Sequence, residues 1–214
     1  HLQERGYQVY GTSRSAPVPE AGKGSSFQMP PFHYKMLRMD VNSDKSVQDG
    51  VHAVLADAGR IDAVVNCAGF GIAGAVEDTS TEEAKAQLET NFFGTLRVCR
   101  TVLPTMREQG SGTIVNISSM AGLIGIPYQA MYSASKFAIE GMTEAMRLEV
   151  KPFGIKVCLV EPGDFSTGFT ANRLRTRASQ SHSAYDEMLE RALKVMEHDE
   201  TTGGPPDAVA QRIE

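Results

Sequence analysis

The stretch Val64–Gly74, VVNCAGFGIAG, bears most directly on the fold, because an apolar run passes straight into three glycines. Gly69, Gly71 and Gly74 have the G-x-G-x-x-G spacing of a dinucleotide-binding loop, a motif that is meaningful only where it joins a strand to the helix it opens. An apolar strand precedes the glycines, but the next helical pattern begins only at Ser80. No second strand ending in an acid follows at the required distance. The spacing alone therefore does not predict a pyrophosphate loop here.

Outward from this stretch, short apolar runs alternate with helical patterns. Five runs predict strands: Tyr7–Thr12, Tyr34–Met39, Ile61–Asn66, Thr113–Ser118 and Ile155–Val160. Several are continuously apolar, which is typical of parallel strands covered on both faces. The alternation indicates βαβ units, and hence an α/β, Rossmann-like, doubly wound parallel sheet in a single domain.

The helices between these strands follow from the spacing of apolar residues. The sequence predicts helices at Ser43–Ala58, from Ser80 to the glycines at 110 and 112, and from about Ser133 to Val150. The second of them opens with an S-x-x-E capping box formed by Ser80 and Glu83. Its apolar positions recur every three or four residues, so one face of that helix is expected to be buried.

Three other stretches do not belong to this regular pattern. Residues 15–31 are rich in Pro, Gly and Ser and predict a long surface loop. Residues 164–204 are polar, with a basic cluster at 173–177 and a predicted helix at Ala184–His198. We interpret 164–204 as a variable region that covers a substrate pocket. Leu2–Gly6 resembles the last turn of a helix capped by Gly6, so the chain is expected to open inside an element.

Composition narrows the classes of partner. The 214 residues carry a formal charge of −5, which argues against nucleic acid or an anionic membrane as a partner. No apolar run approaches the roughly 20 residues of a membrane-spanning helix, and the first residues are too polar for a signal peptide. Neither the three cysteines nor the five histidines have ligand spacing. We therefore predict a cytoplasmic, metal-free protein that acts on a small molecule.

The sharpest chemical signal is Tyr132-Ser133-Ala134-Ser135-Lys136. Residues i and i+4 share a helix face, so the Lys136 ammonium should lie near the Tyr132 phenol. A neighbouring cation lowers the pKa of a phenol from about 10 and lets it exchange a proton with a substrate oxygen. An ordinary surface pair has the same spacing. Ser119 strengthens the functional interpretation, because it follows a strand at the sheet edge where ligands bind.

Asn91 lies inside the helix predicted from Ser80, where asparagine is mildly unfavourable. Two interpretations are open at this point. Asn91 is either an exposed polar residue of the helix, or a side chain that holds a water or the backbone in place near Lys136.

Five motifs together resemble the short-chain dehydrogenase/reductase family, in particular hydroxysteroid and retinol dehydrogenases and carbonyl reductases. They are NCAG at 66–69, TNFFG at 90–94, IVNISS at 114–119, YSASK at 132–136 and EPGDFST at 161–167. The resemblance covers residues 2 to 170 and implies the catalytic set Asn91, Ser119, Tyr132 and Lys136. Tyr132 would donate or accept the proton, Ser119 would polarise the carbonyl, Lys136 would bind ribose and lower the pKa of Tyr132, and Asn91 would support a proton relay.

The resemblance also implies a nicotinamide cofactor. Its binding residues would be Arg14, Asp40, Val41, Asn66, Ala68, Gly69, Tyr132, Lys136, Pro162, Gly163 and Thr167. Cys67 replaces the second asparagine of the family's NNAG loop. The first predicted strand runs into Arg14 instead of the acidic residue of NAD-preferring members, and an arginine suits a 2′-phosphate. We therefore expect NADP(H) rather than NAD(H).

The family pattern further implies a sheet that lacks its first and last strands, since the glycine-rich pyrophosphate loop would lie before residue 1. We expect an oxidoreductase that interconverts a secondary alcohol and a ketone or aldehyde with NADP(H). Residues 122–131 and 164–198 would set the substrate, with Ile124, Ile126, Phe165 and Phe169 in an apolar pocket. A homodimer or homotetramer through the helices after Ser80 and Ser133 is expected. The alternatives are a catalytically silent dinucleotide-sensing or scaffold protein, and a lyase or epimerase using the same Tyr/Lys pair.

Overall fold

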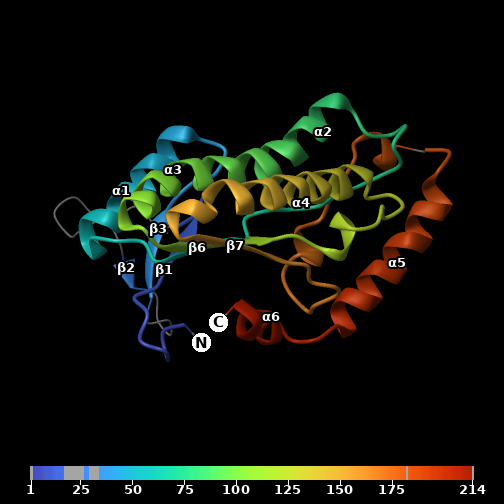
Figure 1. The fold of residues 1–214 in the computed structure, drawn as a ribbon. Helices are drawn as coiled ribbons and strands as arrows, with labels where there is room; N and C mark the ends of the chain where they lie inside the picture. The colour runs from blue at the N-terminus through green and yellow to red at the C-terminus, as the bar shows by residue number, and fades with distance from the viewer. Residues whose placement is uncertain (1, 17–26, 29–33, 182, 214) are drawn as a thin grey trace.

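Parallel strands and the helices between them build the molecule, as the apolar runs predict (Figure 1). The computed structural model describes residues 2–16, 27–28, 34–181 and 183–213. The strands are β1 Tyr10–Ser13, β2 Phe27–Gln28, β3 Lys35–Arg38, β4 Ala63–Asn66, β5 Ile72–Ala73, β6 Gly112–Ile117, β7 Ile155–Val160 and β8 Leu174–Arg175. The helices are α1 Asp44–Ala58, α2 Thr81–Leu88, α3 Gly94–Gln109, α4 Ala130–Val150, α5 Asp186–Thr202 and α6 Asp207–Ile213.

The strands form separate ladders rather than one continuous sheet. β1 pairs in parallel with β3, and β2 lies antiparallel on the other side of β3. β4, β6 and β7 form a second, fully parallel ladder in that order. Among the described residues no ladder joins β1 to β4. The two ladders and the helices that follow their strands agree with the predicted Rossmann-like α/β fold.

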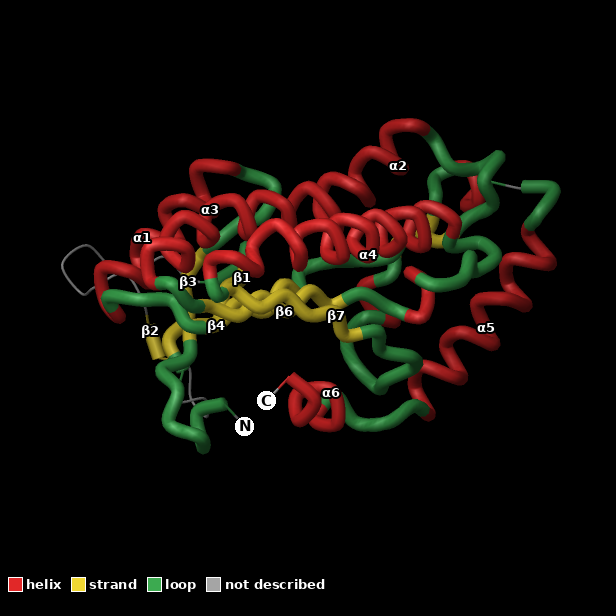
Figure 2. Tube along the Cα trace, viewed as in Figure 1, coloured by secondary structure: helices red, strands yellow, loops and turns green. Residues whose placement is uncertain are grey.

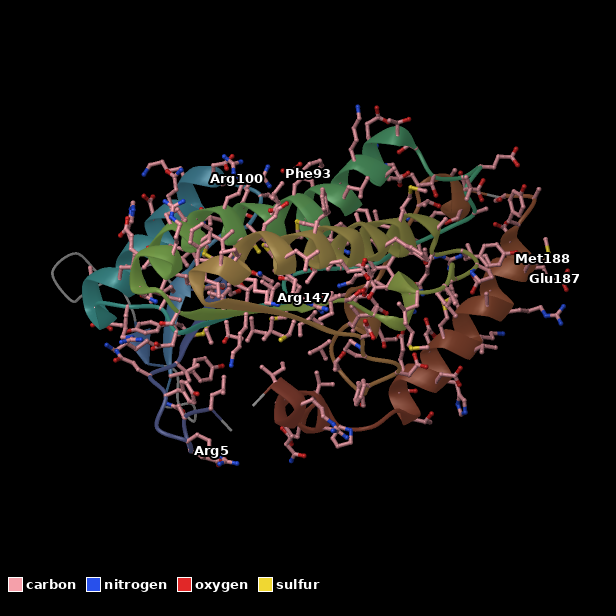
Figure 3. All side chains as sticks on the ribbon, in the orientation of Figure 1. Arg5, Phe93, Arg100, Arg147, Glu187 and Met188 are labelled. Atoms are coloured by element: carbon pink, nitrogen blue, oxygen red, sulfur yellow. The ribbon has the colours of Figure 1, made fainter. Side chains whose placement is uncertain are left out.

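The larger of two apolar clusters lies between the second ladder and the helices α1, α3 and α4, which run along one side of it (Figures 1 and 2). Val47 of α1, Met106 of α3 and Ile114 of β6 are completely buried there. Arg147 extends from α4 to this ladder, where its Nε donates to the Val157 carbonyl at 3.0 Å (Figure 3). The strand-rich layer and its helices are thereby fixed to each other.

Coverage of β7 differs from the sequence expectation. Ile155 and Val157 are buried against the helices, whereas the alternate residues Lys156 and Cys158 are exposed. Of the described helices, α6 lies on the opposite side of the strands from α1, α3 and α4 (Figure 1). The prediction of strands covered on both faces is therefore wrong for β7, because in the described residues its second face is left largely open.

The predicted starts at Ser43 and Ser80 are confirmed. Ser43 accepts a hydrogen bond from Ser46 N–H as the N-cap of α1, and Ser80 and Glu83 form the complete capping box of α2. The helix expected to run unbroken from Ser80 instead contains a π-helical turn at Glu89–Phe93, which separates α2 from α3. Such turns insert one extra residue per turn and often mark functional sites. Asn91 lies in this one.

Several local features differ from or extend the predictions. Residues 2–6 form a turn in which Gly6 has φ +87° and donates to the Gln3 carbonyl, as expected for a capping glycine. Within the predicted loop 15–31, Phe27–Gln28 form β2, while residues 17–26 and 29–31 lie outside the described part of the chain. The pairing of β5 with β8 was not predicted. It attaches the covering region to the glycine loop.

Candidate active site

The first two turns of α4 carry the predicted Tyr/Lys pair. α4 begins at Ala130, three residues earlier than expected, so Tyr132 already lies on the helix. The Lys136 Nζ lies 5.7 Å from the centroid of the Tyr132 ring and donates a 2.8 Å hydrogen bond to the carbonyl of Ile117, the last residue of β6. Lys136 is thus held at the carboxyl end of the strand that precedes Ser119.

Ser119 begins the 3₁₀ turn that follows β6, and its Oγ accepts the Ala121 N–H at 3.1 Å. Its hydroxyl also hydrogen-bonds the Tyr132 side chain, an interaction that lowers the pKa of the phenol. The structure therefore brings Ser119, Tyr132 and Lys136 together at one edge of the sheet, as the sequence predicted. A substrate oxygen placed at this edge could contact both hydroxyl groups.

The electrostatics of the pair differ from the prediction. Burial raises the pKa of Tyr132, and the hydrogen bond from Ser119 only partly offsets that effect. The Glu200 carboxylate raises this pKa further, while the Arg173 cation lowers it. The expected lowering of the Tyr132 pKa by Lys136 is therefore wrong for this structure. Burial also lowers the pKa of Lys136 to about 8, because a buried ammonium loses its hydration.

Two side chains oppose the effect of burial on Lys136. The Cys67 thiolate and the Glu140 carboxylate both raise the pKa of Lys136 by favouring its charged form. Reciprocally, the ammonium lowers the pKa of the Cys67 thiol, although burial of the sulfur raises that pKa overall. Cys67, the residue that departs from the family's NNAG pattern, is thus an electrostatic neighbour of Lys136.

Asn91 is only 2% exposed, so its interpretation as an exposed helix residue is wrong. Its Oδ1 accepts the Phe70 N–H at 3.1 Å, and its Nδ2 donates to the Phe70 carbonyl and to Ser135 Oγ, both at 3.0 Å. A Cβ on Gly69 would lie 3.1 Å from Asn91 Oδ1, so the loop can approach this closely because residue 69 is a glycine. Asn91 joins the glycine loop to α4, beside Lys136. Its role in a proton relay stays a prediction.

Gln87 holds the same loop and was missed by the sequence analysis. It is fully buried on α2, accepts the Ile72 N–H at 2.8 Å and donates to the Phe70 carbonyl at 2.6 Å. The signal that could have found it is a polar residue at a position where the helical period of α2 requires an apolar one.

A second amide network, also missed, lies beneath the predicted cofactor residue Asn66. The Asn66 Nδ2 donates to Asn116 Oδ1 at 2.9 Å, and Asn116 in turn donates to Thr143 Oγ1 on α4 at 2.8 Å. Asn116 is completely buried in β6. An asparagine within the apolar run of that strand was the available signal, since buried polar groups need partners.

The predicted cofactor residues follow the carboxyl ends of their strands. Arg14 follows β1, Asp40 and Val41 follow β3, Ala68 and Gly69 follow β4, and Pro162, Gly163 and Thr167 follow β7. Carboxyl ends of parallel strands meet at one edge of a sheet, which is where ligands bind in such folds. Arg14, Ala68, Gly69, Gly163 and Thr167 are exposed. Their placement is therefore compatible with ligand contact.

Three other residues of this set already have local partners. The Asp40 Oδ1 accepts the Asn42 N–H at 3.0 Å, and Val41 is buried against Gly94 of α3. The Pro162 carbonyl accepts the Met120 N–H at 3.1 Å. Cofactor contacts at these positions remain predictions.

The chemistry of Lys136 fits a nicotinamide dinucleotide. An ammonium has three N–H donors, and among the described residues Lys136 uses one hydrogen bond, to Ile117. Donors remain for the hydroxyl groups of a ribose near the exposed residues Ala68 and Gly69. The described residues contain no cluster of three His, Cys, Asp or Glu side chains that could hold a metal ion.

The predicted covering region 164–204 does contact Tyr132. The Phe169 ring lies 5.4 Å from the Tyr132 ring, centroid to centroid. Phe169 also packs so closely on Gly71 that a Cβ there would lie 2.9 Å from its ring. Of the other predicted pocket residues, Phe165 packs near Gly204 and Ile124 is exposed. Phe169 is therefore the apolar residue that the structure brings to Tyr132.

Polar contacts fasten this region to the start of α2. The Arg177 N–H donates to Glu83 at 2.8 Å, and the Tyr185 hydroxyl donates to Glu77 at 2.7 Å. Buried Leu189 of α5 packs in a small apolar cluster with Ala73 of β5. The neighbouring α5 residues Glu187 and Met188 point outward from the molecule (Figure 3).

A parallel sheet with Ser119, Tyr132 and Lys136 together at its carboxyl edge defines an α/β fold of the dinucleotide-binding type. The family model described as short chain dehydrogenase matches residues 1–178. The chain belongs to this family, and its activity class is oxidoreductase.

Two relatives whose names state an activity match different lengths of this chain. A 3-ketodihydrosphingosine reductase of Bacteroides thetaiotaomicron is 47% identical over 99% of this chain and 75% of its own length. Human retinol dehydrogenase 8 is 35% identical over 81% of this chain and 55% of its own length. The predicted similarity to retinol dehydrogenases is thus confirmed.

Solved structures agree with the fold. A short-chain dehydrogenase from Streptomyces avermitilis superposes with a TM-score of 0.80 at 32% identity, covering 99% of this chain and 75% of that one. A family member from Burkholderia phymatum in complex with NAD gives a TM-score of 0.71 at 25% identity, covering 81% of this chain and 63% of that one. None of the described helices combines the length and the apolar character that spanning a membrane requires.

Proposed function

We propose that the protein is an NADP(H)-dependent oxidoreductase that interconverts a secondary alcohol and a ketone or aldehyde. The observation that carries this proposal is the Tyr132 phenol, hydrogen-bonded to Ser119 and one helical turn from the buried ammonium of Lys136. A phenol whose pKa is raised stays protonated at neutral pH and can donate a proton to a carbonyl oxygen. This favours carbonyl reduction as the direction that the site supports.

Each residue has a distinct part in the proposed reaction. Ser119 and Tyr132 would hydrogen-bond the carbonyl oxygen and increase the positive charge on its carbon. When bound, the nicotinamide supplies the hydride for that carbon. Tyr132 would transfer its proton to the developing alkoxide, the hydrogen bond from Ser119 would stabilise the phenolate that remains, and the Lys136 ammonium would bind the cofactor ribose. Asn91 would hold the glycine loop in place against α4 through its hydrogen bonds to Phe70 and Ser135.

The choice of NADP(H) rests on Arg14. This residue is exposed directly after β1, and an arginine can bind a 2′-phosphate with two parallel charge-assisted hydrogen bonds. The neighbour from Burkholderia phymatum binds NAD, so the test compares both cofactors. Arg14→Glu is expected to lower kcat/KM with NADPH by at least about tenfold and to leave kcat/KM with NADH within about threefold. Equal loss with both cofactors would contradict the assignment.

The substrate proposal starts from the Bacteroides relative, whose name specifies reduction of 3-ketodihydrosphingosine. We propose a ketone with an apolar chain, because Phe169 presents an aromatic ring to Tyr132. The experiment measures NADPH oxidation with 3-ketodihydrosphingosine, all-trans-retinal, a steroid ketone and simple ketones. Cofactor consumption that Tyr132→Phe abolishes, with cofactor binding intact, supports the proposal. Cofactor binding without consumption would favour the silent dinucleotide-binding protein, and product formation without net consumption would favour a lyase or epimerase.

A homodimer or homotetramer is proposed as well. The helices that follow Ser80 and Ser133 present exposed apolar side chains, among them Phe93, Phe137 and Leu148. Exposed apolar clusters of this kind commonly mark contacts between subunits. Cytoplasmic localisation stays a prediction from composition.

A further inference from the structure

A short column of side chains connects Tyr132 to the interior of the covering region. The Phe169 ring lies 5.4 Å from the Tyr132 ring on one side, and the Arg173 guanidinium carbon lies 5.8 Å from the Phe169 centroid. Arg173 in turn pairs with Glu200 near the end of α5. The charges of Arg173 and Glu200 both act on the phenol of Tyr132. The column therefore belongs to the surroundings of the reacting group.

Arg173 is buried to an unusual degree for an arginine. Its side chain is 4% exposed and that of Glu200 is 12% exposed. Nη2 of Arg173 binds Oε1 of Glu200, and the Thr170 hydroxyl donates to the other carboxylate oxygen at 2.5 Å. The carboxylate is thus well satisfied. The guanidinium is not, because Nε and Nη1 are buried and have no hydrogen-bond partner in the described structure.

Buried N–H donors without acceptors are rare and costly in folded proteins, so such donors call for an explanation. The Phe169 ring attracts the positive charge of the guanidinium but is a weaker acceptor than an oxygen atom. A purely structural ion pair would not need an arginine with two unused nitrogens. The position of these nitrogens, one aromatic ring away from Tyr132, indicates that their acceptor is a ligand.

The following inference rests on the proposed function and specifies its substrate class. We propose that Arg173 is a specificity-determining residue that hydrogen-bonds a second, uncharged oxygen atom of the substrate, a hydroxyl or carbonyl oxygen, through Nε and Nη1. Glu200 already neutralises the arginine, so the remaining donors suit a neutral acceptor better than an anion. Because Phe169 lies between the two groups, the bound substrate displaces its ring from Tyr132 and takes its place.

The test compares matched ketones in the full chain. The probes are 2-octanone, its analogues with one hydroxyl at successive chain carbons, and the keto acid with a terminal carboxylate. The parent should show at least about tenfold higher kcat/KM for one hydroxyketone than for 2-octanone. Arg173→Lys keeps the cation beside Glu200 but removes Nε and the planar fork. It should abolish this preference, so that kcat/KM for the hydroxyketone falls to within about threefold of kcat/KM for 2-octanone measured in the same variant.

Arg175 supplies the matched control. It pairs with Glu190 at 2.5 Å in the same region and also has a buried Nε without a partner, but it does not act on Tyr132. Arg175→Lys should retain the preference for the hydroxyketone. The inference is overturned if Arg173→Lys slows both ketones equally, if the parent shows no preference, or if it prefers the keto acid.

A second variant and a binding measurement keep the inference testable in other circumstances. If Arg173→Lys does not fold, Glu200→Gln uncovers the arginine charge and should shift the preference toward the keto acid; an unchanged preference counts against the inference.

If the parent reduces none of the ketones, the proposed function fails. Titration calorimetry with 2-octanol and the matching diols then decides for Arg173. Tighter binding of one diol that is lost in Arg173→Lys supports the site, and equal or undetectable binding of all probes overturns it.

Discussion

At the scale of single residues, the site depends on buried polar groups whose partners are far away in the sequence. Asn91 bonds Phe70 and Ser135, and Lys136 bonds Ile117. The residue types and their spacing were visible in the sequence, and so was the closeness of residues 132 and 136. The balance between burial and charge was not visible, because burial depends on segments such as Phe169 and Glu200 that pack onto the site from the covering region.

Asn91→Ala should be strongly destabilising. It removes three hydrogen bonds and leaves the Phe70 N–H without its partner, while the Phe70 carbonyl keeps only the bond from Gln87. We expect the free energy of unfolding to fall by about 2–3 kcal/mol, measured by urea denaturation. Asn172→Ala is the control, since Asn172 is exposed and its change should stay within about 0.5 kcal/mol. Equal effects of the two substitutions would show that Asn91 does not brace the loop.

Lys136 should give stability a specific pH dependence. Burial lowers its pKa from 10.5 to about 8, so between these values the unfolded chain binds the proton and the folded chain does not. Stability contributed by this group therefore rises with pH from about 8 to above 10, by up to roughly 3 kcal/mol. Urea denaturation at pH 7, 8, 9 and 10 should show this slope in the parent and lose it in Lys136→Met. In Lys45→Met, whose lysine is exposed, the slope should persist.

At the scale of elements, the capping signals and strand runs were predictable because they depend on neighbours in sequence. The π-helical turn at Glu89–Phe93 and the pairing of β5 with β8 were not. The first arises because buried Asn91 takes long-range partners, and the second because two short segments about a hundred residues apart meet. The early start of α4 follows likewise from its contacts, since Ser133 Oγ accepts the Ile126 N–H before the helix begins.

Glu83 serves two elements at once, and its removal should affect both. One carboxylate oxygen closes the capping box with Ser80, and the other accepts the Arg177 N–H of the covering region. In Glu83→Ala, amide hydrogen exchange measured by NMR should accelerate at Ser80 and at Arg177. Ser80→Ala should destabilise α2 by about 1 kcal/mol while leaving Arg177 protected. If amide exchange at Arg177 is unchanged in Glu83→Ala, the hydrogen bond between Glu83 and Arg177 does not hold the covering region to α2.

At the scale of the whole molecule, the second ladder packs with α1, α3 and α4 around the main core, and the covering region folds back on the carboxyl edge of that ladder (Figure 1). The sequence predicted this layout because alternation of strands and helices leaves few topologies. It did not predict how β7 would be covered, because coverage of a strand depends on which segments reach its second face. Exposed apolar side chains remain at Phe93 in the π-helical turn and at Phe137 and Leu148 on α4, and these could be buried by a further contact.

Self-association should depend on those helices. Leu148 is 72% exposed on α4, and Phe137 on the same helix is 48% exposed. We expect Leu148→Lys and Phe137→Lys together to shift the chain toward monomer in sedimentation velocity, because burying a charge at an apolar contact is costly. Met188→Lys is the matched control: Met188 is 50% exposed but lies on the outward side of α5 (Figure 3). If Met188→Lys changes the sedimentation distribution and the two α4 substitutions do not, the contact between subunits lies on α5 instead. If the parent protein is monomeric at all concentrations, the proposed self-association is wrong.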